Sequence, residues 1–303
     1  MNTLPDERPD AGLADVRPLP ADRGPTVLRI ALGGHLRRLR ESRGISMVDA
    51  GHAIRGSESK ISRLELGQLG FKDRDLRDLL DLYRVGDPGE YRDFLDLARA
   101  ANQPGWWQQY DEPSWFETYI GLEQGASVVR CYENQYIPGL LQTEDYARNI
   151  VALGNKREIP DRVAVRLRRQ RILDRPDPPV IWAVIDEVAL LRTARLRPGG
   201  NSRIAREQLE HLLALSERRN VTIQVLPITA GPALSTTGPF TLLRFPVPQL
   251  PDIVYVEQLT GAHYLDKPAD LQQYRSAMDL MCAVQAQQPE DTNALLCELI
   301  DGL

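Results

Sequence analysis

The chain has 303 residues, of which 42% are hydrophobic and 26% are charged, and its formal net charge is −5. A chain of this length can form two domains, each with its own hydrophobic core. No stretch approaches the roughly 18 consecutive apolar residues of a transmembrane helix, and the acidic balance excludes a protein that is basic over its whole surface.

The first 25 residues combine five prolines with several charges and have no apolar core. This composition predicts a disordered arm at residues 1–25. The absence of an apolar core also argues against a signal peptide. We therefore expect the folded part to start near residue 26.

Apolar residues at helical spacing predict a first helix from Val27 to Ser42, which Gly44 ends. Ser46 is the predicted N-cap of a short second helix that ends at Ile54. Two further helical stripes follow later in the chain and predict a fourth and a fifth helix. Their core residues are Leu76, Leu79, Leu80 and Tyr83, then Phe94, Leu95 and Leu97.

The third helix is unlike its neighbours because only two aliphatic residues, Ile61 and Leu64, define its inward edge. Arg55 and Gly56 break the chain before it, and Ser57 is its predicted N-cap. Its outer edge carries small polar and charged residues: Ser59, Lys60, Ser62 and Arg63. A short helix, a break and a weakly held third helix are typical of a helix-turn-helix.

Charge in the same region favours a nucleic-acid partner. Between Arg29 and Glu65 eight basic residues stand against four acidic ones. Such a local surplus favours a face that binds a polyanion, with a solvated helix surface as the alternative. On the third helix, small hydroxyls permit close approach and Arg63 can donate two hydrogen bonds to guanine. A plain helical bundle would not explain this polar edge.

Residues 32–83 resemble the helix-turn-helix domain of the phage-repressor and Cro class, also called the xenobiotic-response-element family. The matching core is SMVDAGHAIRGSESKISRLELG (46–67), with the Ile-Ser-Arg-Leu-Glu-x-Gly ending typical of that family. Arg55 departs from the family, which usually has a small residue, often glycine, at the end of the second helix. Met47 replaces a polar residue that often contacts the backbone.

The resemblance implies specific roles for residues at matching positions. It places one group near bases or the adjacent backbone: Ser57, Glu58, Ser59 and Arg63. It places a second group near phosphates: Ser46, Met47 and Lys60. Ser62 completes the outer edge as a DNA-binding candidate. Arg40 and Glu65 fall where the family forms a structural ion pair.

A tryptophan-rich segment at residues 102–116 predicts a linker that ends the helical bundle. Beyond it, the pattern predicts strands at 127–133, 179–185, 221–227, 238–245 and 252–259. It predicts helices at 144–153, 161–173, 201–219, 268–287 and 289–300. Strands gathered late, with helices before and after them, predict an α+β domain at 117–303 with a mostly antiparallel sheet.

This second domain offers no convincing catalytic constellation. Its histidines are isolated, and the pair Asp186-Glu187 is better explained as a strand end than as catalytic carboxylates. The loop at 229–239 lacks the lysine of a phosphate-binding loop. The basic run at 162–171 is either a solvated face or a DNA contact. Three dispersed cysteines fit a reducing cytoplasm and should be buried: Cys131, Cys282 and Cys297. We expect no enzyme, metal or cofactor.

Several segments of this domain closely resemble the C-terminal domain of WhiJ-type, antitoxin-like regulators of actinomycetes. They include YENQYIPGLLQTEDYA (132–147), RRQRIL (168–173), VIDEVALLR (184–192), QLEHLLAL (208–215), VTIQVLP (221–227), GPFTLLRF (238–245) and VYVEQLTG (254–261). The resemblance implies a regulator of development or secondary metabolism that is paired with a small protein encoded nearby.

The sequence therefore predicts a mainly α helix-turn-helix domain of five helices at 26–101, followed by the α+β regulatory and dimerisation domain. We expect a cytoplasmic, nucleoid-associated repressor that binds double-stranded DNA as a homodimer on an inverted-repeat operator. The alternative is a small-molecule-binding or enzymatic C-terminal domain with accessory DNA binding.

Overall fold

A computed structural model of the chain describes residues 24–154, 159–194, 202–230, 238–246 and 250–303. Their contacts divide the chain into two compact units. Of the described residues, the N-terminal unit contains those from 24 to 106 with 245–246 and 250–251, and the C-terminal unit contains those from 107 to 244 and from 252 to 303. The predicted arm at 1–25 lies outside the described residues except for its last two positions.

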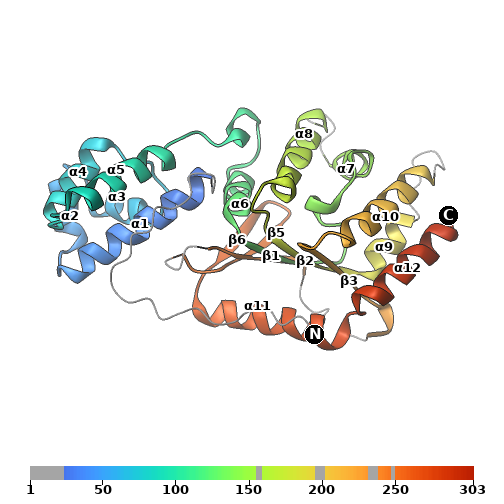
Figure 1. The fold of residues 1–303 in the computed structure, drawn as a ribbon. Helices are drawn as coiled ribbons and strands as arrows, with labels where there is room; N and C mark the ends of the chain where they lie inside the picture. The colour runs from blue at the N-terminus through green and yellow to red at the C-terminus, as the bar shows by residue number, and fades with distance from the viewer. Residues whose placement is uncertain (1–23, 155–158, 195–201, 231–237, 247–249) are drawn as a thin grey trace. The chain divides into compact units, whose positions relative to one another are not determined.

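The described part of the N-terminal unit contains five α-helices (Figure 1). They are α1 (Pro25–Ser42), α2 (Met47–Ala53), α3 (Glu58–Glu65), α4 (Asp73–Leu82) and α5 (Pro88–Ala101). The apolar stripes seen in the sequence meet in one core, in which Leu32, Ile61 and Phe94 are almost fully buried. The predicted helical domain is confirmed.

The C-terminal unit is built on a sheet of six strands within the described residues, in the order β3-β2-β1-β4-β5-β6. Their bounds are β1 (Val128–Glu133), β2 (Val180–Asp186), β3 (Val221–Leu226), β4 (Phe240–Arg244), β5 (Ile253–Gln258) and β6 (Gly261–Leu265). The pairs β1–β2 and β2–β3 are parallel. The pairs β1–β4, β4–β5 and β5–β6 are antiparallel, so the sheet is mixed.

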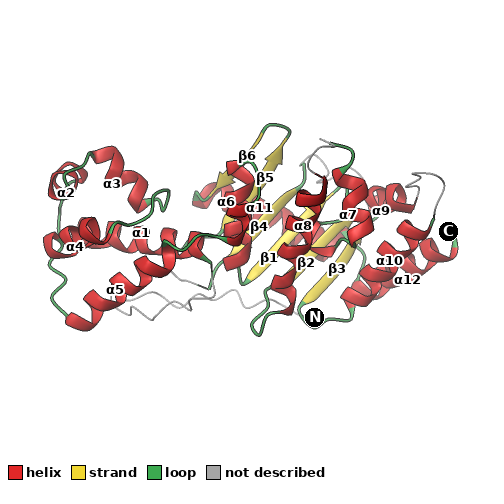
Figure 2. Cartoon of the chain, turned by 90° about the horizontal axis from the view of Figure 1, so that it is seen from above, coloured by secondary structure: helices red, strands yellow, loops and turns green. Residues whose placement is uncertain are grey.

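Helices cover both faces of this sheet. They are α6 (Ser114–Gly125), α7 (Glu144–Val151), α8 (Ile159–Gln170), α9 (Glu187–Ala194), α10 (Arg203–Ser216), α11 (Pro268–Leu280) and α12 (Pro289–Asp301). Short 3-10 helices cover Trp106–Gln109, Gly139–Leu141, Arg171–Asp174 and Ile228–Ala230, and a π-helix covers Met281–Gln285. Figures 1 and 2 show α6, α7 and α8 on one face and α11 on the other. No helix in the described ranges is long and apolar enough to cross a membrane.

The predicted fold class, a helical domain followed by a domain of helices and sheet, is confirmed, but three elements and the parallel half of the sheet were not predicted. Helix α6 has no apolar stripe because five consecutive residues from Tyr119 to Glu123 are buried. Helix α9 follows β2 directly, with no glycine or proline between them. Strand β6 is only partly buried and has weak alternation.

The cysteines only partly follow the expectation of burial. Cys131 and Cys282 are buried, whereas Cys297 is exposed. The inward edge of α12 is formed by Thr292, Leu296 and Ile300, four residues apart. Cys297 follows Leu296 directly and therefore points away from this edge.

Candidate DNA-binding surface

The turn between α2 and α3 has a closed geometry that the sequence did not reveal. The Gly56 N–H donates to the Gly51 carbonyl at 2.8 Å, and the Arg55 N–H donates to the His52 carbonyl at 3.0 Å. These two bonds form a Schellman motif, which requires a left-handed residue after the C-cap Ile54. That residue is Arg55, with φ of 53°, and not the glycine that follows it.

The two predicted N-caps are confirmed. The Ser46 hydroxyl accepts from the Asp49 N–H at 3.1 Å, and the Ser57 hydroxyl accepts from the Lys60 N–H at 3.3 Å. Ser46 also donates its proton to the Asp49 carboxylate at 2.7 Å. The caps therefore define where both helices of the motif begin.

Most of the outer edge of α3 faces solvent. Ser57, Glu58, Ser59 and Arg63 are exposed, while Ile61 and Leu64 are 1% and 3% exposed. Within the described residues Arg63 makes one long hydrogen bond, from Nε to the Ser59 carbonyl at 3.4 Å. Most of its five N–H donors thus remain available to a ligand. Ser62 and Met47 are partly buried and Ser46 is exposed.

Lys60 has a structural role that the sequence did not indicate. Its ammonium lies 2.5 Å from the carboxylate of Asp75 on α4, and Asp75 is only 2% exposed. Burial by itself would raise the pKa of Asp75, but hydrogen bonds from Lys60 and Arg74 outweigh it, and the pKa is lowered. Lys60 therefore neutralises a buried acid and ties α3 to α4, which limits its reach toward a phosphate.

Arg40 and Glu65 form a bidentate ion pair between α1 and α3. The Arg40 Nε lies 2.6 Å from one carboxylate oxygen and its second terminal nitrogen lies 2.9 Å from the other. A third nitrogen donates to the Ile45 carbonyl at 3.0 Å. The two residues are 5% and 7% exposed. The pair therefore braces α3 in the way that the resemblance implied.

Two glycines inside helices let the backbone of α3 approach its neighbours. A Cβ at Gly33 would lie 2.4 Å from the Leu64 carbonyl oxygen, and one at Gly51 would lie 2.9 Å from the Ser57 carbonyl carbon. No side chain fits at either place, so α1 and α2 press directly on α3. The sequence analysis did not single out Gly33 or Gly51. A glycine in the middle of a helix was the signal that could have indicated this close packing.

The basic surplus of this region is smaller than the sequence suggested. Four of the eight basic side chains lie in ion pairs with acids of the described residues: Arg37–Glu41, Arg40–Glu65, Arg55–Asp78 and Lys60–Asp75. Two of these acids, Asp75 and Asp78, belong to α4 and lie outside the counted segment. The positive potential of this face is therefore weaker than the number of basic residues alone would suggest.

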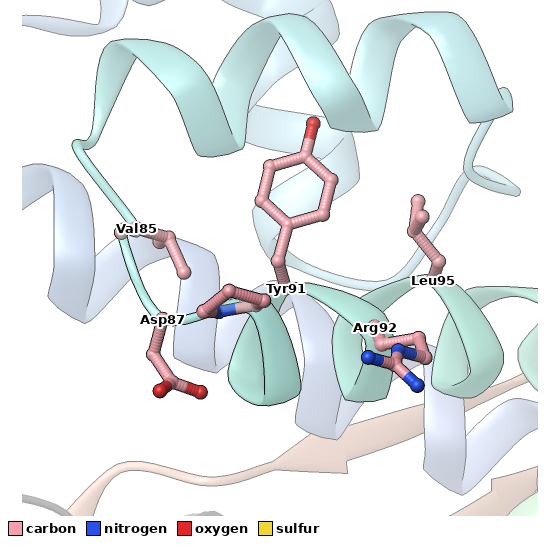
Figure 3. A pocket seen from close by; sticks show the side chains of 7 residues that line it. Val85, Asp87, Tyr91, Arg92 and Leu95 are labelled. Atoms are coloured by element: carbon pink, nitrogen blue, oxygen red, sulfur yellow. The ribbon is translucent and has the colours of Figure 1, made fainter.

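An open hollow of about 440 Å³ lies at the turn between α4 and α5. Figure 3 shows Tyr91 and Leu95 pointing to one side of α5, and Asp87 and Arg92 pointing to the other. No residue of α2 or α3 lines this hollow. It is therefore separate from the surface described above.

Candidate residues of the C-terminal unit have structural roles. Asp186 accepts from the Val188 N–H at 2.9 Å, and Glu187 accepts from the Ile228 N–H at 2.8 Å. The pair thus caps α9 and anchors a loop. The segment 229–239 lies largely outside the described residues. In the part of the chain that is described, no three His, Cys, Asp or Glu side chains are arranged to hold a metal.

Comparison with known proteins agrees with this division. A helix-turn-helix domain model matches residues 31–95, which include all of α2, α3 and α4. A model described as a domain of unknown function, DUF5753, matches residues 116–298. No curated protein and no solved structure matches the chain. The helix-turn-helix match supports a DNA-binding regulator. The second model covers more than half of the chain, and the chain therefore belongs to the DUF5753 family.

Proposed function

We propose that the chain is a sequence-specific transcription repressor of the WhiJ type that reads double-stranded DNA through α3. The observation that carries this proposal is the exposed polar edge of a helix whose other sides are rigidly held. The ion pair Arg40–Glu65 and the bond Lys60–Asp75 hold α3 from two directions. A rigid reading helix needs little ordering on binding, which favours affinity and specificity.

The edge of α3 supplies groups suited to a major groove. Arg63 can donate two parallel hydrogen bonds to guanine, and Glu58 can accept from a cytosine amino group. Ser57 and Ser59 are small enough to allow close approach. Ser46 is exposed at the start of α2, and its hydroxyl must give up the hydrogen bond that it donates to Asp49 in order to contact a phosphate.

A single helix-turn-helix contacts only a few base pairs, so we infer that the protein acts as a homodimer on an inverted repeat. In that arrangement two reading helices lie about 34 Å apart. The apolar stripes of the N-terminal helices are buried in the core of their own unit. The dimer contact is therefore formed by residues 117–303. We further propose that this antitoxin-like domain senses a signal, which is either a ligand or a small partner protein, and that it catalyses no reaction. We place the protein in the cytoplasm, at the nucleoid.

Genome-wide capture of DNA fragments by the full-length protein tests the proposal, followed by titration of the recovered site and of random DNA. Arg63→Ala should cost about 1–3 kcal/mol on the recovered site and little on random DNA. Arg77→Ala is the control, because Arg77 is an exposed arginine of α4 paired with Asp73. Equal losses on both DNAs would remove Arg63 from base reading.

The oligomeric state is tested separately by light scattering. We expect dimers at tens of micromolar and two protein chains per recovered site. A chain that stays monomeric both alone and on its DNA would contradict the dimer proposal while leaving DNA reading by α3 intact.

A further inference from the structure

A cavity of about 760 Å³ lies in the C-terminal unit, between the sheet and the helices α6 and α8 (Figure 1). Alternate residues of three neighbouring strands form its floor. They are Val129, Cys131 and Glu133 from β1, Thr241 from β4, and Tyr255 and Glu257 from β5. A cavity of this size can enclose a small organic molecule.

The cavity lies where the order of the strands reverses. From β1 the chain adds β2 and then β3 on one side, as parallel strands, and later places β4 on the other side, antiparallel to β1. The lining continues past the carboxyl end of β1 into the segment from 135 to 142. In open sheets covered by helices, ligands bind beside the carboxyl ends of the strands at such a switch point. The location therefore favours a ligand.

Aromatic rings form one wall of the cavity. Trp115, Phe116 and Tyr119 come from α6, and Tyr136 comes from the segment after β1. Trp115 and Phe116 are only partly buried and Tyr136 is exposed, so ring surface remains open to a ligand. Because aromatic rings pack well on other rings, this wall favours a flat ring system as the ligand body.

The charged side chains of the described lining balance one another. They are Arg162, Arg166 and Arg169 from α8, with Glu112, Glu123, Glu133 and Glu257. Arg169 donates to both carboxylate oxygens of Glu123, at 2.8 and 2.7 Å. Burial lowers the pKa of Arg166, whereas Glu257, Glu133 and Glu112 act in the opposite direction. Arg166 therefore has acids beside it, and this lining does not require an ionic ligand.

Glu133 supplies an uncharged hydrogen-bond donor. Burial, and then the neighbouring Glu257, raise the pKa of Glu133 to about 8, so its carboxyl group carries a proton at pH 7. Three arginines then face three carboxylates in the described lining. A protonated carboxyl group donates one hydrogen bond. An ionic ligand would lose its hydration in this cavity without gaining an unmatched counter-charge.

We propose that this cavity binds an uncharged, flat aromatic molecule whose ring lies against the aromatic wall and whose hydrogen-bond acceptor contacts Glu133. This assignment gives the basic run at 162–171 a role in an internally balanced lining rather than on a solvated face. The inference deepens the sensing role proposed above, and it rests on that role for its regulatory meaning.

Fluorescence titration of the full-length protein with three naphthalene probes tests the charge of the ligand. The probes are 2-naphthamide, 2-naphthoate and 2-naphthylmethylammonium, which share one ring system and differ in charge. At pH 7 we expect the amide to bind about tenfold more tightly than either ion, because each ion loses hydration against a balanced lining. Tighter binding of either ion, or no binding of the amide up to its solubility limit, would overturn the assignment.

The pH dependence of amide binding tests the donor. The charged groups that face Glu133 are Glu257 on β5 and Arg166 and Arg169 on α8. Burial raises the pKa of Cys131, two positions earlier on β1. Glu133 itself is protonated at pH 7 and largely ionised at pH 9, so affinity for the amide should fall about tenfold over that range.

Glu133→Gln keeps a hydrogen-bond donor at every pH, so this variant should bind the amide as tightly at pH 9 as at pH 7. Glu144→Gln is the matched control and should keep the tenfold fall, because Glu144 is an exposed acid of α7 paired with Arg148 and does not line the cavity. A wild-type affinity that does not change with pH, or an equal fall in both variants, would contradict the contact with Glu133.

If Glu133→Gln does not fold, Tyr136→Ala takes its place, because Tyr136 lines the cavity and is 39% exposed. That variant should weaken binding of the amide severalfold, and an unchanged affinity would overturn the site. The titrations contain no DNA, so their failure is distinct from a failure of operator binding.

Discussion

The ion pair between Arg40 and Glu65 gives the sharpest test of how the reading helix is held. Its two contacts measure 2.6 and 2.9 Å, and the two side chains are 7% and 5% exposed. In Glu65→Gln the amide oxygen can still accept one bond, but the amide nitrogen then faces an arginine donor. Removing one partner of a buried pair leaves an uncompensated charge and costs about 3–5 kcal/mol. We expect a loss near the lower end, because one hydrogen bond remains.

Hydrogen exchange of the full-length protein is the suitable assay. The four tryptophans lie at 106, 107, 115 and 182, so none lies within α1–α5, whereas amide exchange follows each helix directly. A loss of about 3 kcal/mol corresponds to a roughly 100-fold faster exchange of amides in α1 and α3, where exchange proceeds through opening of the unit.

Asp96→Asn, on α5 of the same unit, is the control for an exposed pair. Asp96 contacts Arg99 at 2.6 Å, but the side chains are 62% and 64% exposed. Such a pair contributes less than about 1 kcal/mol. If both variants speed exchange in α3 equally, the buried pair contributes nothing of its own. Combining Arg40→Met with Glu65→Leu should restore much of the protection, because it removes both charges together.

Three further predictions follow from individual contacts. Arg55→Gly should be about 1 kcal/mol more stable than Arg55→Ala in thermal unfolding. Both variants lose the same exposed salt bridge, but only glycine adopts the left-handed conformation without strain. Equal melting temperatures would contradict this. Lys60→Ala should lower the stability of the N-terminal unit by about 2 kcal/mol, because it leaves the buried Asp75 without its lysine partner. Hydrogen exchange of amides in α3 and α4 measures this loss. Weaker DNA binding with unchanged exchange would refute it. Glu133 has a pKa raised to about 8, so its stabilising contribution is full below its unfolded value and is lost as pH rises through 8. The melting temperature of the C-terminal unit should therefore fall over that range, and the slope should flatten in Glu133→Gln.

The sequence alone determined the local structure of the N-terminal unit. The apolar stripes that place Leu32, Ile61 and Phe94 in the core repeat every three or four residues, so the pattern can be read without knowing the fold. The N-caps Ser46 and Ser57 bond to residues three positions away, which is equally local. Weak strands such as β6, and helices buried on several sides such as α6, lack a clean period and were missed.

Tertiary structure alone decided what several charged side chains do, Lys60 and Arg169 among them. Lys60 meets Asp75 fifteen positions away, and Arg169 meets Glu123 forty-six positions away. The outer edge of α3 reads the same in the sequence whether Lys60 points to DNA or to α4. Arginines at 162–171 likewise read as a solvated run, although Arg169 is buried and Arg166 lines a cavity. Desolvation and pairing depend on distance in space, and the parallel half of the sheet brings together segments whose separation no local pattern encodes.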